Sequence, residues 1–133
     1  VLGVAAVTAS HAAYAWSLYR RGARNDALGW GLRAAAWGAG VAATRTQPTA
    51  AAVAVGGAAV LVTSALAGDP ALRTDAGKGM SHGANLLVAA EGLTALRATL
   101  KQRKRRARLV RAAEAGALVI GHLLLIDGFR RTR

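Results

Sequence analysis

Residues 50–68 read AAAVAVGGAAVLVTSALAG, an uncharged stretch that ends at Gly68, Asp69 and Pro70. At about 1.5 Å of rise per residue, a helix of this length approaches the thickness of the hydrocarbon core of a bilayer. It is the cleanest candidate in the chain for a membrane-spanning helix. The stretch therefore predicts an all-α fold, and the other apolar segments are compared with it as candidates for spanning helices.

Four further apolar segments lie on either side of this stretch, separated by charged or turn-forming residues. Together they predict a single integral membrane domain over residues 1–133, a polytopic transmembrane bundle of four or five short helices rich in alanine and glycine. The candidate helices are residues 1–19, 27–44, 50–68, 81–100 and 109–129, with a basic linker at 101–108. Only two glycines interrupt residues 81–114, so one long helix that projects from the membrane is an alternative.

The composition agrees with a membrane protein that has basic loops. The 133 residues include 18 Lys and Arg against 6 Asp and Glu, a net charge of +12, yet 53% are apolar and the mean hydropathy is +0.28. A protein that binds nucleic acid through such a charge would be polar on average. With 34 alanines and 5% aromatic residues, a soluble enzyme core would be thin, and the lack of cysteine excludes disulfide scaffolds and cysteine-ligated metals.

Aromatic and basic residues together mark one end of the first segment. Three arginines, Arg20, Arg21 and Arg24, follow it at once. The neighbouring aromatic residues, typical of a membrane interface, are Tyr14, Trp16, Tyr19 and Trp30. The positive-inside rule then places the loop of residues 20–26 in the cytoplasm or matrix.

The second basic cluster conflicts with this orientation. Five spans put residues 101–111 on the opposite side of the membrane from residues 20–26, whereas an even number of spans between them would place both inside. The weakest spans are residues 27–44, which contain Arg33, and residues 81–100, which contain Glu91 and Arg97. The sequence leaves four and five spans open.

Small residues recur at four-residue spacing within residues 27–44. They form two stripes, one of Gly31, Ala35 and Ala39 and one of Ala34, Gly38 and Ala42. In lipid, such stripes are typical of a face on which another helix packs closely.

Glu91 is the one carboxylate well inside an apolar segment. An ionisable side chain at membrane depth is costly unless it is paired or hydrated, so such residues often line ion or proton paths. We therefore regard Glu91 and Arg33 as candidates for such a path, with His82 as a further neighbour. The alternative is a structural ion pair of Glu91 with Arg33 or Arg97 that fixes the register of the helices.

Two histidines form the second candidate site. His11 lies nine residues before Arg20 and His122 eight before Arg130, so five spans place both imidazoles at a similar depth on helices that run in the same direction. Two such histidines could ligate haem b between facing helices. The alternative is that each one forms a hydrogen bond within the bundle, His11 beside Thr8 and Tyr14 and His122 to a backbone carbonyl.

The densest charge cluster is a tract that lacks interleaved aromatic residues. Its members are Lys101, Arg103, Lys104, Arg105, Arg106, Arg108 and Arg111. Without stacking residues, anionic lipid or an acidic partner subunit fits it better than nucleic acid. We expect two anchoring ion pairs beside it and at the exit of the last helix, Arg111 with Glu114 and Asp127 with Arg130 or Arg131.

These features favour a non-catalytic accessory subunit of a larger multi-subunit membrane complex, one option being an energy-transducing complex. No catalytic residues and no metal site are predicted, since the sequence holds no phosphate loop, nucleophile elbow or metal-ligand spacing. The alternatives are a small homo-oligomeric transporter or channel that uses Glu91 and Arg33, a haem b-binding anchor that uses His11 and His122, and a soluble nucleic-acid-binding helical protein. We expect no cofactor, haem b being the alternative, and membrane lipids, other membrane subunits or a second copy as partners, in a bacterial plasma membrane or an organellar inner membrane.

Overall fold

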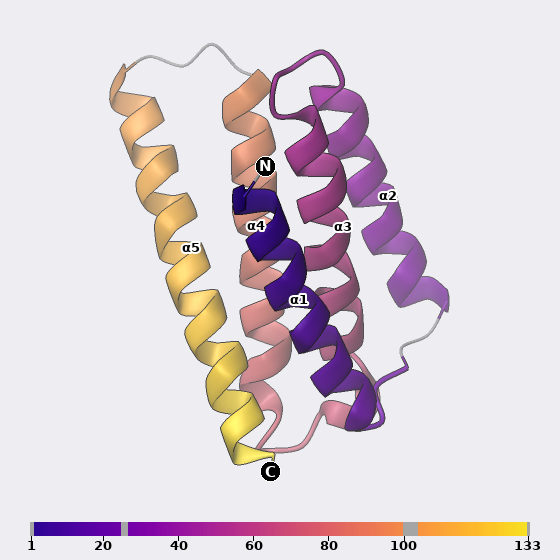
Figure 1. The fold of residues 1–133 in the computed structure, drawn as a ribbon. Coiled ribbons are helices and arrows are strands. Elements are labelled where there is room, and N and C mark those ends of the chain that lie inside the picture. Colours follow the sequence, from indigo (N-terminus) through magenta and orange to yellow (C-terminus); the bar gives the residue numbers. More distant parts are fainter. Residues whose placement is uncertain (1, 25–26, 100–103, 133) are drawn as a thin grey trace.

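The computed structural model describes residues 2–24, 27–99 and 104–132 (Figure 1). Over these residues the chain forms five α-helices and no strand, which confirms the all-α fold. The helices are α1 (Leu2–Arg20), α2 (Ala27–Thr44), α3 (Ala50–Ala67), α4 (Lys78–Thr99) and α5 (Lys104–Arg131), with a short 3₁₀ helix, η1 (Pro70–Leu72), between α3 and α4.

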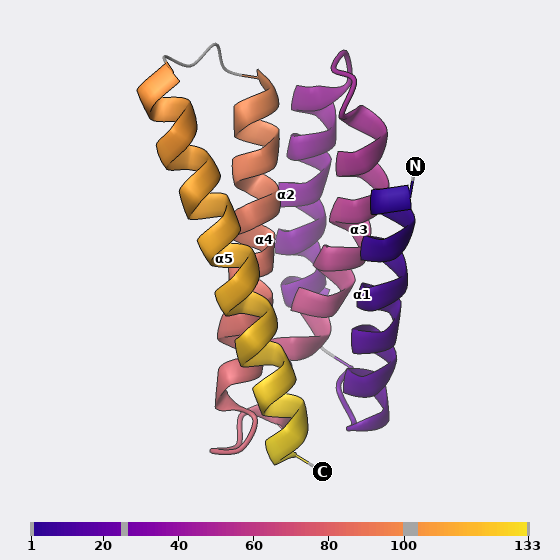
Figure 2. The same cartoon turned by 60° about the vertical axis from the view of Figure 1, so that its left-hand side comes forward.

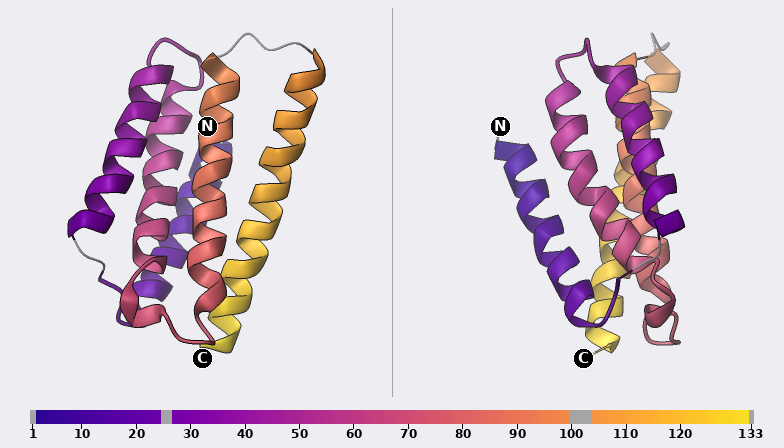
Figure 3. Two further views of the ribbon diagram at one scale, coloured as in Figure 1. Left: turned by 180° about the vertical axis from the view of Figure 1, so that it is seen from behind. Right: turned by 90° about the vertical axis from the view of Figure 1, so that its right-hand side faces the viewer.

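The helices stand side by side and alternate in direction along the chain (Figure 1). Seen from behind, α2, α3, α4 and α5 form a row in chain order, and α1 covers the far side of α3 (Figure 3). As a result α1 and α5 run in the same direction, as the five-segment pattern predicts, and their lower ends lie near one another in both rotated views (Figure 2).

Local sequence explains where the helices end. Gly22 has a φ of 93°, a left-handed conformation that glycine adopts without strain, and it turns the chain out of α1. After α3, Asp69 caps η1 by accepting a hydrogen bond from the backbone N–H of Ala71 (2.7 Å), with Pro70 at the first position of the turn. The same carboxylate accepts the backbone N–H of Arg24 (2.6 Å), which joins two loops at one end of the bundle.

The core lies along α3 and α4. Its largest fully buried apolar side chains are Leu18, Met80, Leu87 and Leu125, and alanines fill much of the rest. Helices α4 and α5 approach most closely where Gly83 faces Gly121, because a Cβ at Gly83 would lie 2.6 Å from the Gly121 carbonyl oxygen. Only glycine allows two helices to pack this closely at these positions.

The boundaries of the last two helices differ from the sequence prediction. Helix α4 begins at Lys78 instead of residue 81, and α5 spans Lys104–Arg131 instead of 109–129, so much of the predicted linker 101–108 is helical. Arginine and lysine are good helix formers, and a run of them does not end a helix. The single long helix over residues 81–114 is also wrong, since α4 ends at Thr99 and α5 runs back along it.

Two of the described helices are long and apolar enough to cross a membrane. They are α3, over Ala50–Ala67, and α5, over Arg106–Arg131. Nearly half of α3 is buried inside the bundle, whereas α5 is mostly exposed. Helix α5 therefore places an apolar surface on the outside of the molecule.

The small-residue stripes of α2 face outwards. Gly31, Ala35 and Ala39 are all exposed, and a Cβ at Gly31 or Gly38 would meet no atom within 4 Å. These stripes therefore do not pack within the chain, and the close glycine contact is made by α4 and α5 instead.

Basic residues gather at both ends of the bundle. Arg20, Arg21 and Arg24 lie at the same end as the α3–α4 loop, and the basic start of α5 lies at the other. Three helices separate the two clusters, which is an odd number. The two clusters therefore lie at opposite ends of the bundle, and the number of membrane crossings between them stays a prediction.

Candidate functional site

Helices α2, α3 and α4 line a mostly apolar, partly open cavity of about 130 Å³. We call it the α2–α3–α4 cavity. Its wall includes Trp37 from α2, Val60 and Leu61 from α3, and Val88 from α4. The two charged side chains of its wall are Arg33 and Glu91, so the structure brings the predicted pair to one site.

Arg33 is held by groups from two helices. Its Nε donates to the Ser64 hydroxyl (3.0 Å) and its NH1 donates to the Gly29 carbonyl (3.0 Å). Ser64 in turn donates to Oδ1 of Asn85 (2.9 Å), which links α2, α3 and α4 in one chain of hydrogen bonds. The guanidinium also lies beside Gly68 at the C-terminal end of α3, where the helix dipole favours a positive charge.

Glu91 has no such support. Within residues 2–24, 27–99 and 104–132, its carboxylate makes no hydrogen bond or ion pair, although it lies on the wall of the same cavity as Arg33. The alternative prediction that Glu91 pairs with Arg33 or Arg97 to fix the helix register is therefore wrong for these residues. His82, the other suggested neighbour, is exposed and lines a different hollow near the α3–α4 loop.

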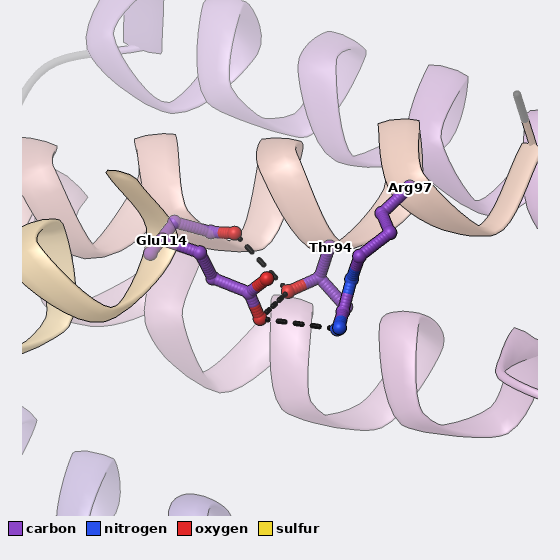
Figure 4. A network of polar contacts seen from close by, with 4 residues as sticks. Thr94, Arg97 and Glu114 are labelled. Atoms are coloured by element: carbon purple, nitrogen blue, oxygen red, sulfur yellow. Dashed lines mark hydrogen bonds and ion pairs between the residues drawn. The ribbon is translucent and has the colours of Figure 1, made fainter. Parts of the chain in front are cut away.

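The register pair is made by another carboxylate (Figure 4). Oε1 of Glu114 on α5 accepts a hydrogen bond from the Thr94 hydroxyl (2.8 Å) and forms an ion pair with Arg97 (3.3 Å). Both partners lie on α4. The expected pair of Arg111 with Glu114 does not form, because Glu114 points across to α4 instead of along its own helix. This contact fixes α5 against α4 near the upper end of the bundle.

The two predicted histidines also meet. The ring centroids of His11 and His122 lie 6.0 Å apart, and Tyr14 completes a triangle with sides of 5.5 and 5.8 Å. Nδ1 of His11 is hydrogen-bonded to the Thr63 hydroxyl (2.9 Å), and Nδ1 of His122 to the Tyr14 hydroxyl (3.2 Å). His11 is buried and thus couples α1 to α3, while His122 couples α5 to α1.

This triangle bears on the haem hypothesis. Tyr14 packs against both imidazoles, and both Nδ1 atoms have side-chain partners, whereas a haem iron would be ligated through Nε2. Both histidines thus form hydrogen bonds within the bundle, and haem b ligation stays a prediction. The partners differ from those expected, since His11 bonds to Thr63 and His122 to a tyrosine hydroxyl instead of a carbonyl.

Part of the basic tract lies outside the described residues, namely Lys101 and Arg103. Lys104 and Arg105 begin α5, and Arg106, Arg108 and Arg111 are exposed along its first turns. At the other end of α5, Asp127 forms an ion pair with Arg131 one turn later, as predicted. The described part of the tract thus forms an exposed basic helix end and not a loop.

Three side chains that the sequence reasoning missed complete these sites. Trp37 lines the cavity with its Nε1 anchored on the Ala54 carbonyl (3.0 Å), and Thr63 and Asn85 are the partners of His11 and Ser64. A signal was present for Trp37, because it lies four residues after Arg33 and so on the same helical face. Thr63 and Asn85 carry no such signal, since their partners are far away in the sequence.

Comparison of the chain with protein-family models, with curated protein sequences and with solved structures finds no match.

Proposed function

We propose that this chain is an integral membrane helical bundle that serves as a non-catalytic subunit of a larger membrane complex, in a bacterial plasma membrane or an organellar inner membrane. All five helices cross the bilayer in this proposal. The observation that carries it is the outward face of the molecule, which is apolar on three helices. The exposed members include Leu2 and Trp16 of α1, Leu28 and Leu32 of α2, and Leu109, Val119, Ile120, Leu123 and Ile126 of α5.

The distribution of polar groups agrees with a membrane solvent. His11, Thr63 and Ser64 are buried and hydrogen-bonded between helices, while large apolar side chains face outwards. A soluble protein rarely exposes apolar surface over several helices, whereas lipid favours it. Trp16 and Tyr19 stack at the exposed end of α1 beside the basic turn, as interfacial aromatic residues do.

Two kinds of exposed apolar surface suggest two kinds of neighbour. The outer face of α5 presents leucine, isoleucine and valine, which contact lipid chains well. The outer face of α2 presents the stripe of Gly31, Ala35 and Ala39, which favours the backbone of another helix. We therefore assign α5 to lipid and α2 to a partner subunit, with the basic start of α5 on anionic headgroups or an acidic partner.

The test is extraction of the tagged protein from its native membrane in mild detergent, followed by a native gel and mass analysis of the band. We expect co-migration with other polypeptides. Gly31→Leu should remove those polypeptides, because the new side chain occupies the α2 stripe. The matched control is Gly116→Leu on α5, where a Cβ also meets no atom within 4 Å, and it should keep them. A homogeneous oligomer of this chain alone would overturn the proposal.

A second candidate function rests on one observation, the shared cavity of Arg33 and Glu91. A small homo-oligomeric transporter or channel would use Glu91 as the group that accepts a proton or cation along the path. In proteoliposomes, Glu91→Gln should then abolish flux while leaving the native-gel band unchanged. Asp127→Asn is the control, because Asp127 is paired with Arg131 at the end of α5 and is not among the cavity-lining residues. Flux that survives Glu91→Gln would remove this candidate.

A further inference from the structure

The α2–α3–α4 cavity has the size of a small ligand site. Its volume of about 130 Å³ is close to that of an engineered apolar cavity of about 150 Å³ that binds benzene. Its wall is aliphatic on α3 and α4, through Val60, Leu61 and Val88, and aromatic on α2, through Trp37. The space therefore holds an apolar body of about the size of one six-membered ring, and it is partly open to the outside.

The two charges on the wall are not equivalent. Arg33 is compensated locally, because its donors reach the Ser64 hydroxyl and the Gly29 carbonyl and its guanidinium lies by the C-terminal end of α3. Glu91 lies within α4, away from its ends, and no cation of the described residues pairs with it. The nearest basic side chain along α4 in the C-terminal direction, Arg97, is engaged by Glu114. The cavity therefore presents one uncompensated carboxylate.

Trp37 supplies a fixed aromatic wall near this carboxylate. Its indole N–H donates to the Ala54 carbonyl, and its Cδ1 lies 3.2 Å from where a Cβ of Gly57 would be, so a glycine on α3 makes room for the ring. An indole ring is the aromatic surface that attracts a cation most strongly. A carboxylate and an indole on one apolar cavity are complementary to a positive charge that carries an apolar substituent.

We propose that the α2–α3–α4 cavity binds a small monovalent organic cation, an ammonium group with one apolar ring or short alkyl groups. The positive charge pairs with the Glu91 carboxylate, and the apolar part packs on Trp37, Val60 and Val88. The inference deepens the second candidate function by naming its class of solute, and it requires only binding. The subunit assembly proposed above does not depend on it.

The experiment measures binding of benzyltrimethylammonium to the purified protein in nanodiscs of zwitterionic lipid by titration calorimetry. Glu91→Gln, which keeps the shape of the side chain, should raise Kd at least about tenfold because the coulombic attraction between the two charges is lost. Asp127→Asn should leave Kd within about twofold, since that carboxylate is paired with Arg131 at the end of α5 and does not line the cavity. A neutral probe of the same shape, neopentylbenzene, should bind no better to the wild type than to Glu91→Gln.

Arg33→Gln separates a cation from a zwitterion. A cation should bind as tightly or more tightly when the guanidinium is removed, because a repulsive charge is lost. A zwitterion whose carboxylate pairs with Arg33 should instead bind more weakly to Arg33→Gln than to the wild type. If a zwitterionic probe binds to the wild type more tightly than benzyltrimethylammonium does, the proposal is overturned. An unchanged Kd in Glu91→Gln would overturn it as well.

A fluorescence measurement tests the site without the Glu91 and Arg33 variants, which could fold poorly. With Trp16 and Trp30 replaced by phenylalanine, Trp37 is the sole tryptophan of the chain, and the cation should change its emission. No change at saturating cation would overturn the assignment even if calorimetry reports binding. Binding without flux in proteoliposomes would keep the site and remove the transport function, so the two failures are distinguishable.

Discussion

Helix α5 contacts α4 through glycine backbone, whereas it meets α1 mainly through long side chains. On the α4 side, Gly83 faces Gly121 and Gly128 lies against Met80. On the α1 side, Tyr14 reaches His122 and Phe129, and Arg21 reaches the Phe129 carbonyl (3.2 Å) and the Thr132 hydroxyl (3.0 Å). The contact with α4 depends mainly on shape, apart from the polar contacts of Glu114 with Thr94 and Arg97, and the contact with α1 depends on hydrogen bonds and rings.

In the membrane setting proposed above, the two kinds of contact contribute differently to stability. Apolar side chains gain little by leaving lipid, so tight packing of small residues supplies much of the attraction between membrane helices. Hydrogen bonds between such helices are worth only about 0.6 kcal/mol on average. We therefore expect α4 and α5 to form the firm unit of the molecule and α1 to be held more weakly.

The largest expected effect comes from filling the glycine contact. Gly83→Val places a side chain where a Cβ alone would lie 2.6 Å from the Gly121 carbonyl oxygen. The backbone of α5 can move away from this contact only at a large cost in free energy. Overpacking of this kind should lower the free energy of unfolding by about 3 kcal/mol, measured by detergent-induced unfolding in mixed micelles. Gly116→Val on α5 is the control, since its Cβ would meet no atom within 4 Å. Equal stability of both variants would contradict the close approach of α4 and α5.

The next effect tests the polar contact that holds α1 on α3. Thr63→Val keeps the shape of the side chain but leaves the buried His11 without its Thr63 partner. The free energy of unfolding should fall by about 1 kcal/mol, less than for the glycine contact. Thr99→Val removes a hydroxyl that is exposed and bonds only to its own helix, so it should change little. A larger loss than in Gly83→Val would reverse the ranking of the two regions.

A smaller effect isolates the hydrogen bond between α1 and α5. Tyr14→Phe removes the hydroxyl bonded to His122 and keeps the ring that packs on Phe129. The expected loss is about 0.6 kcal/mol of unfolding free energy, measured in the same micelles. A double-mutant cycle with His122→Phe gives the coupling energy of the pair. A coupling near zero would show that the rings alone hold this side of α5.

The smallest effect concerns the exposed ion pair at the end of α5. Asp127→Asn removes the partner of Arg131 one turn later, but both side chains are about half exposed. Such pairs contribute less than about 0.5 kcal/mol, so the unfolding midpoint should barely move and should become less sensitive to salt. A loss that matches Tyr14→Phe would mean that this pair contributes as much as the α1–α5 hydrogen bond.

Much of the fold follows from the apolar segments of the sequence and from the turn-forming residues between them. The helices α1, α2 and α3 lie where the apolar runs predict them, because glycine, proline and asparagine or aspartate end those runs. The beginning of α5 was missed because charge density was interpreted as a linker. Charge marks contact with water or headgroups, but lysine and arginine continue a helix readily.

The sites were predictable only in part. Spacing along the chain placed His11 and His122 at one depth, and Arg33 and Glu91 within neighbouring segments, and both pairs do come together. The partner that each side chain contacts depends on the rotation of its helix about the helix axis. A weakly amphipathic, alanine-rich sequence does not specify this rotation. For the same reason the sequence offered the stripe of Gly31 on α2 as a packing face, while Gly83 and Gly121 make the close contact.

The position of α1 has a consequence for the order in which the chain is made. Helices α4 and α5 are neighbours in the sequence and can pair as soon as both are synthesised, whereas the main partner of α1 is α3, and the whole of α2 lies between them. Contacts between distant segments form later than local ones. Of the five helices described, α1 leaves the ribosome before the others and must therefore wait for its binding surface, and a truncation that ends before α3 would leave α1 without its main partner.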